Sequence, residues 1–214
     1  MDYNIHMNKK NHGFTLIELM VTLAVFGLLA AFAAPNVSSF MRNNRLGTQT
    51  NEFISALHIT RSEAVKRGEV ITLCISDGAS PPNCDSTSVS WQAGWIIFTD
   101  LNGDASFNNA SEDLVRIHEA LTDDNTLTSS HLEGVAYNVQ FTPTGVLRAR
   151  DADSSTSPTR TFTLCDSYTD NVKRAKGINI SKLGNISLAV DTNSNITVNN
   201  GVTSNDVTCP AATK

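Results

Sequence analysis

The chain has 214 residues, of which 16 are lysine or arginine and 21 are aspartate or glutamate, so its formal net charge is −5 at pH 7. This mild acidic excess argues against bulk attraction to nucleic acid, although a local basic patch stays open. The length allows one globular domain in addition to a terminal segment.

The amino end carries a long apolar run behind a short polar segment. Residues 2–12 are polar, Gly13 follows, and residues 14–34 contain a single charge, Glu18. About twenty apolar residues suffice to span a bilayer, and basic residues ahead of the run place the amino end inside. A carboxylate within such a run usually faces a partner rather than lipid. Because the run contains no cation, Glu18 predicts pairing with an α-amino group, which cleavage between Gly13 and Phe14 would create in the same subunit or in a neighbour.

The motif Gly13-Phe14-Thr15-Leu16-Ile17-Glu18 resembles the processing motif of type IV pilins and of the pseudopilins of type II secretion. The resemblance implies that the prepilin peptidase and methyltransferase cuts after Gly13 on the cytoplasmic side and N-methylates Phe14. It also implies that Glu18 sets the register of assembly and that Pro35 occupies the place of a helix-kinking proline.

Two other kinds of membrane segment remain open. A secretory signal peptide has a shorter apolar core and a small-residue cleavage site at its far end, which residues 30–34 offer, but it leaves Glu18 unexplained. An ordinary transmembrane anchor also fits the length of the run. The processing motif favours the pilin interpretation over both.

Helical periodicity continues beyond Pro35. Apolar residues recur mostly at three- and four-residue steps and polar residues fill the other faces, so residues 35–67 predict the amphipathic half of the same helix. Basic residues in the last turn complement the helix dipole, and Gly68 supplies the terminating residue. A continuous helix over residues 14–67 would be about 80 Å long.

After Gly68 the periodicity changes to two or to short apolar runs, which predict strands. The strand candidates are residues 70–75, 94–99, 114–118, 136–141, 161–165, 177–180, 186–190 and 196–198. Turn-forming clusters separate them, and residues 154–158 predict a mobile loop. The pattern indicates an α+β chain in which an antiparallel sheet, or a pair of sheets, wraps the amphipathic half-helix.

The resemblance to pilins gives these elements a predicted organisation. It has four parts: a cleaved leader at 1–13, a transmembrane and filament-core helix at 14–34, the amphipathic half of that helix at 35–67, and a β-rich periplasmic head at 68–214. The implied fold is the pilin fold. The chain would cross the bacterial inner membrane once, with its head in the periplasm, and would then enter a pilus or pseudopilus.

Four cysteines form an even set in a chain whose body is expected outside the cytoplasm, so two disulfides are predicted. Four cysteines allow three connectivities. We favour pairing Cys74 with Cys84, which closes a proline-containing loop, and Cys165 with Cys209, which pins the tail beside an internal strand. Zinc is the alternative, although neither a CxxC spacing nor a nearby histidine pair supports it.

Several segments of the head carry a second, narrower resemblance, to the FimT/FimU and GspH minor pilins. They are residues 45–46, 61–68, 94–100, 141–145 and 162–165. The resemblance implies a structural subunit at or near the tip of a type IV pilus or type II secretion pseudopilus. Its implied partners are other major and minor pilins or pseudopilins, contacted through the N-terminal helix, and no cofactor is implied.

Some members of the FimT branch resemble DNA receptors for natural transformation that use a late glycine-arginine-any-arginine motif. Residues 184–187 of this chain read Gly-Asn-Ile-Ser, so both arginines are absent. Phosphate binding needs clustered cations, and the departure counts against DNA as a partner. A compensating patch would consist of Lys173, Arg174, Lys176 and Lys182. A DNA-binding minor pilin acting in DNA uptake is therefore the alternative function.

Metal binding and catalysis find little support in the remaining motifs. Asp100, Asn102 and Asp104 alternate as in a calcium loop, but Glu112 comes one residue late, and a turn explains them more simply. The histidines show no HExxH pattern, so no metal site is predicted. No GxSxG nucleophile elbow occurs, and an anchored periplasmic enzyme is the least favoured reading. Trp95 heads an apolar strand and predicts core packing.

Overall fold

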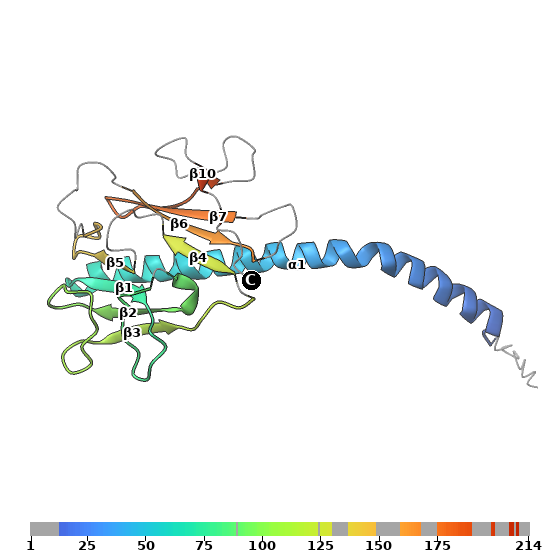
Figure 1. Ribbon diagram of the computed structural model, residues 1–214, viewed down its shortest axis with the longest axis horizontal. Helices are drawn as coiled ribbons and strands as arrows, with labels where there is room; N and C mark the ends of the chain where they lie inside the picture. The colour runs from blue at the N-terminus through green and yellow to red at the C-terminus, as the bar shows by residue number, and fades with distance from the viewer. Residues whose placement is uncertain are drawn as a thin grey trace, which may run out of the picture. The chain divides into compact units, whose positions relative to one another are not determined.

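The structure is a computed structural model with two compact units, Met1–Arg42 and Asn43–Lys214. It describes residues 13–88, 90–123, 125–129, 137–148, 159–167, 175–189, 198–199, 206–207 and 209. Helix α1 (Leu16–Arg67) begins in the first unit and ends in the second. The strands lie in the second unit, together with the C-terminal part of α1 (Figure 1).

Both ends of α1 are capped. At the start, the backbone N–H of Glu18 donates to Thr15 Oγ1 at 3.3 Å, so Thr15 is the N-cap. The predicted start at Phe14 is therefore slightly early. At the end, Gly68 takes a φ of +69°, and its N–H donates to the carbonyl oxygen of Ala64 at 3.0 Å. A left-handed glycine there is the expected helix terminator, and this prediction is confirmed.

The first sheet has four antiparallel strands in the order β3-β2-β1-β5. They are β1 (Ile71–Ile75), β2 (Trp95–Thr99), β3 (Leu114–His118) and β5 (Asn138–Phe141). A register shift between Ile97 and Phe98 marks a bulge in the pairing of β2 with β3. Strand β3 is therefore an edge strand with an irregular start.

The second sheet is also four-stranded and antiparallel, in the order β4-β6-β7-β8. Its strands are β4 (Thr126–Ser129), β6 (Thr159–Cys165), β7 (Ala175–Ser181) and β8 (Ile186–Ala189). A two-stranded pair, β9 (Val198–Asn199) with β10 (Asp206–Val207), and a short 3-10 helix, η1 (Trp91–Ala93), complete the described elements.

The predicted α+β architecture is confirmed, with a pair of sheets as its β part. Each predicted strand has a counterpart within a few residues of its expected bounds. Strands β4 and β10 and helix η1 were not predicted. The expected mobile loop at 154–158 lies outside the described residues.

The C-terminal part of α1 shares one hydrophobic core with both sheets. The ring of Phe53 on α1 lies 5.4 Å from that of Trp91, 5.1 Å from Trp95 and 4.8 Å from Phe162. Trp95 is only 2% exposed, which confirms its predicted core position. Burying three large aromatic side chains against the helix makes this cluster a major source of stability for the head.

Candidate processing and assembly site

The residues predicted for processing lie exposed at the start of the first unit. Gly13 precedes α1, and Phe14 is 86% exposed. Glu18 is exposed in the first helical turn. The N-cap role of Thr15 was not predicted, although Thr15 and Glu18 have the spacing of a capping box. The backbone remains helical through Pro35.

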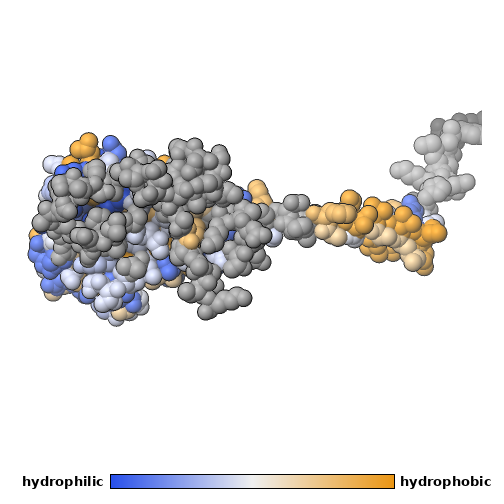
Figure 2. Space-filling model, turned by 45° about the horizontal axis from the view of Figure 1, so that its top comes forward, coloured by the Kyte–Doolittle hydropathy of each residue, from blue (hydrophilic) through white to orange (hydrophobic). Residues whose placement is uncertain are grey.

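Large apolar side chains are exposed along the first half of α1 (Figure 2). Those that are at least half exposed are Leu16, Ile17, Leu19, Met20, Val21, Leu23, Val25, Phe26, Leu28, Leu29, Phe32, Val37, Phe40 and Met41. A large apolar surface on a helix usually marks an interaction site, because exposing apolar side chains to water is unfavourable. Glu18 is the acidic residue of this helix's first turn.

Among the described residues, no helix combines the length and hydropathy that crossing a bilayer requires.

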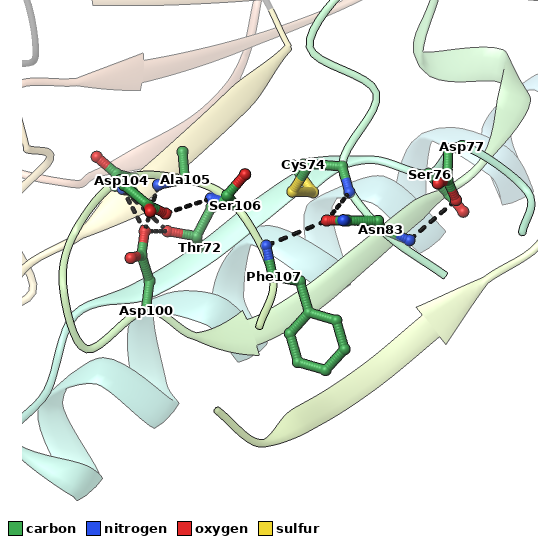
Figure 3. Close-up of a disulfide and its surroundings, with 12 residues drawn as sticks. Thr72, Cys74, Ser76, Asp77, Asn83, Asp100, Asp104, Ala105, Ser106 and Phe107 are labelled. Carbon is green, nitrogen blue, oxygen red and sulfur yellow. Dashed lines mark hydrogen bonds between the residues drawn. A yellow bond between two sulfur atoms is a disulfide. The ribbon is translucent and has the colours of Figure 1, made fainter. Parts of the chain in front are cut away.

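Two disulfides link the four cysteines, in the pairs that the sequence favours. Cys74 joins Cys84, and Cys165 joins Cys209. The side chain of Asn83 organises the loop at the first disulfide: its Oδ1 accepts from the backbone N–H of Cys84 at 2.7 Å and of Phe107 at 3.2 Å (Figure 3). The loop thereby holds Phe107 over the face of β1 that points away from the main core, in a small cluster with Cys74.

The acidic loop after β2 is held by its own hydrogen bonds. Asp100 is fully buried, and its Oδ2 accepts from Thr72 Oγ1 at 2.7 Å, the Ala105 N–H at 3.0 Å and Gln140 Nε2 at 2.5 Å. The same loop and Thr72 appear in Figure 3. Across the described part of the chain, no three His, Cys, Asp or Glu side chains are placed to hold a metal ion. The arrangement supports a structural turn.

Glu112 closes the acidic loop, and its contribution to the stability of the fold depends on pH. Its two carboxylate oxygens accept from the N–H groups of Leu101 at 3.0 Å and Asn108 at 2.8 Å. Burial raises the pKa of Glu112 above its ordinary value of 4.5, and the charges of Asp100 and Asp104 add to the rise. The folded state therefore favours protonated Glu112. Its contribution to stability is full below the unfolded pKa and falls as pH rises through the folded pKa.

The last turns of α1 carry an ion pair whose contribution to stability depends on pH in the opposite direction to that of Glu112. Arg67 Nε lies 2.7 Å from Glu63 Oε2, and Arg67 Nη1 lies 3.2 Å from Asp113 Oδ2. The hydrogen bond from Arg67 lowers the pKa of Glu63. The charged form is thus favoured in the folded chain, so this contribution is present above the unfolded pKa and is lost as pH falls through the folded pKa.

Arg61 ties α1 to two turns of the head. Its Nε donates to the carbonyl oxygen of Gly145 at 3.0 Å, and its Nη2 donates to that of Leu183 at 3.2 Å. Gly145 follows β5, whereas Leu183 lies in the turn between β7 and β8. One guanidinium therefore connects the helix to a turn of each sheet.

Replacing Arg61 with alanine is expected to lower the free energy of unfolding by about 2 kcal/mol, because two hydrogen bonds from a charged donor are lost. The measurement is urea unfolding of the full-length chain in detergent micelles, followed by the fluorescence of the buried tryptophans. Lys182→Ala, at an exposed lysine, is the matched control and should change stability by less than about 0.5 kcal/mol. Equal stability of the two variants would contradict the proposed connection.

The structure describes two of the four residues of the predicted DNA patch. Lys176 on β7 and Lys182 in the following turn are exposed. Lys173 and Arg174 lie outside the described residues. Residues 184–187, where arginines are absent, form the turn and start of β8. The described side chains thus supply two exposed cations of this patch, and they do not establish a DNA-binding surface.

A groove that sequence analysis did not predict lies between α1 and the edge of the first sheet. Its volume is about 340 Å³. Helix α1 contributes Thr48, Asn51, Glu52, Ser55, Ala56 and Ile59, and the sheet contributes Trp95, Arg116 and His118. The helical residues recur at three- and four-residue steps, which is the one sequence signal that marks a common face.

Comparison with protein families gives two matches, one near the amino end and one over the middle of the chain. The family model for the type II transport protein GspH matches residues 49–184. The prokaryotic N-terminal methylation motif matches residues 8–34, which include Gly13, Phe14 and Glu18. The GspH match covers most of the described head.

The individual relatives include a type IV major pilin and a fimbrial protein. The chain is 49% identical over 45 residues to the type IV major pilin protein PilA of Myxococcus xanthus (strain DK1622), covering 21% of this chain and 20% of that protein. It is 36% identical over 63 residues to a fimbrial protein of Pseudomonas aeruginosa, covering 29% of this chain and 40% of the relative. The alignments thus span less than half the length of these curated relatives.

A solved structure matches over a larger share of the chain. The crystal structure of the type IV minor pilin FimU of Pseudomonas aeruginosa (strain PAO1) has a TM-score of 0.50 and 22% sequence identity, and the match covers 70% of this chain and 91% of that one. The likeness shows that the fold is the pilin fold. Because the family model covers more than half of the sequence, the chain belongs to the GspH family, with a pilin N-terminal methylation motif ahead of the GspH region.

Proposed function

We propose that the chain is a minor pilin or pseudopilin, a non-enzymatic structural subunit incorporated at or near the tip of a type IV pilus or a type II secretion pseudopilus. The observation that carries the proposal is the methylation motif at residues 8–34, which overlaps a helix whose large apolar side chains are exposed. Membership of the GspH family supports the same role. Such a surface is stabilised when neighbouring helices cover it.

Processing prepares this helix for assembly in the proposed mechanism. Cleavage after Gly13 leaves the α-amino group of Phe14 as the new amino end, and methylation then modifies that nitrogen. The carboxylate of Glu18 then forms an ion pair with the protonated α-amino group of Phe14, either in the same subunit or in a neighbouring one. Because an unpaired carboxylate among apolar helices is costly, the pair fixes how far one helix slides along another.

Before assembly the subunit is anchored in the inner membrane in this proposal, with its head in the periplasm. The methylation motif and the family support anchoring. Two disulfides in the head suit an oxidising compartment such as the periplasm. The partners are then the prepilin peptidase and methyltransferase, the membrane, and the other pilins or pseudopilins.

A deletion strain of the native bacterium tests the proposed function. If the chain belongs to a type IV pilus, its loss is expected to reduce both the recovery of surface pili and twitching. If it belongs to a type II secretion pseudopilus, its loss is expected to reduce the release of secreted proteins. In either case the reason is that a tip subunit supports assembly of its machine. Both assays are run in parallel, with complementation by the intact chain and by a Gly13→Val variant that blocks processing. Normal pili and normal secretion in the deletion strain would contradict the proposal, as would full rescue by the unprocessed variant.

A further inference from the structure

The groove between α1 and β3 lies where the first sheet stops. Strand β3 is the end strand of that sheet, and its described pairing partner is β2. The register places His118 opposite Trp95 and Arg116 opposite Ile97. Directly opposed residues share a face of the sheet. Trp95 and Ile97 belong to the core that contains α1, so Arg116 and His118 lie on the helix side at the sheet's edge.

A strand added beside β3 would therefore run along the groove. The added backbone would pair with the edge of β3, and its alternate side chains would enter the space above Ala56 and Ile59 of α1. Its other side chains would lie on the outer face beside Ile117, which is 49% exposed. The groove is thus shaped for an extended segment with alternating side chains.

The charged residues at the groove favour one kind of side chain on the added strand. His118 stacks on Trp95, with ring centroids 3.9 Å apart and an interplanar angle of 10°. Its Nε2 lies 3.5 Å from Glu52 Oε2, so the carboxylate of Glu52 already faces a ring nitrogen. Arg116 is exposed, and no ion pair joins it to another described residue. The edge of the groove thus presents a cation to an incoming side chain.

We propose that the β3 edge and this groove bind an extended segment of a partner protein, added as a strand, with a carboxylate side chain directed at Arg116 and an apolar one packed on Ile117. A neighbouring subunit of the proposed assembly would supply such a segment, and to that extent the inference rests on the proposed function. Its test measures peptide binding rather than filament incorporation, so the two proposals can fail separately.

The probe is a short acetylated peptide of alternating valine and glutamate, titrated into the isotope-labelled full-length chain in detergent micelles. Binding is followed by the backbone amide NMR signals of β3. The comparison peptide replaces each glutamate with lysine. The protein variants are Arg116→Glu and, as a matched charge reversal away from the groove, Lys182→Glu.

The expected result is that the glutamate peptide shifts the amides of Leu114–His118 and binds about tenfold more tightly than the lysine peptide. Arg116→Glu should reverse this preference, whereas Lys182→Glu should leave it unchanged. Three results would overturn the proposal: no shift in β3 at millimolar peptide, equal binding of both peptides, or loss of preference in the Lys182 variant alone. Self-association of the chain through β3 that excludes the peptide would also overturn it, by assigning the edge to a second copy.

Discussion

Replacing Glu18 with alanine should remove the chain from sheared filaments while leaving its insertion in the membrane intact. The proposed ion pair with the amine of Phe14 forms among apolar helices, where loss of one charged partner costs about 3–5 kcal/mol. Co-assembly with the other pilins should therefore fall by at least about a hundredfold. Immunoblots of the sheared-filament and membrane fractions measure the two outcomes.

Glu18→Gln is the control that separates charge from helix capping. Thr15 Oγ1 accepts from the backbone N–H of Glu18, which both variants retain. Glutamine also keeps the size of the side chain, so a defect shared by the two variants points to the lost charge. Recovery of Glu18→Ala in filaments at the normal level would rule out the proposed role of this carboxylate.

Gly184→Ala is expected to be among the most destabilising single substitutions in the head. Gly184 has a φ of +76°, and a Cβ atom there would lie 2.2 Å from the carbonyl oxygen of Gly145 and 3.1 Å from Arg61 Nε. The clash involves backbone, so the two turns that Arg61 connects must move apart. We expect the free energy of unfolding to fall by about 4 kcal/mol or more, measured by urea unfolding of the full-length chain in detergent micelles.

Gly68→Ala is the matched control for this result. Gly68 has a similar φ of +69°, but a Cβ atom there would meet nothing within 4 Å. Its cost is therefore the backbone strain alone, about 1 kcal/mol. If Gly184→Ala costs no more than Gly68→Ala, the close approach of the two turns does not govern stability.

The helix and most strands follow from local patterns in the sequence. The bounds of α1 come from Thr15 and Gly68, whose capping chemistry acts over one turn. Strand β4 was missed because Thr126–Ser129 contains a single large apolar residue, Leu127. Its extended conformation depends on pairing with β6, which is far along the chain. Tertiary contacts decide such short polar strands.

The processing segment was visible in the sequence because its chemistry is read from a contiguous motif, which the methylation-motif match covers. The contacts of Arg61 were not visible, since its carbonyl partners lie 84 and 122 positions away. The groove is likewise formed by one face of α1 and by Trp95, Arg116 and His118. Only the packing of the sheet on the helix brings these residues together.

The short, irregular edge of the first sheet affects how readily unassembled subunits aggregate. If the subunit is anchored in a membrane before assembly, as proposed, many copies lie side by side there, and exposed strand edges favour aggregation between them. The bulge between Ile97 and Phe98 disturbs the start of β3, and Arg116 places a positive charge on its remaining length. Like charges would repel when two such edges meet in register. The same edge can therefore admit a complementary strand while discouraging aggregation of identical copies.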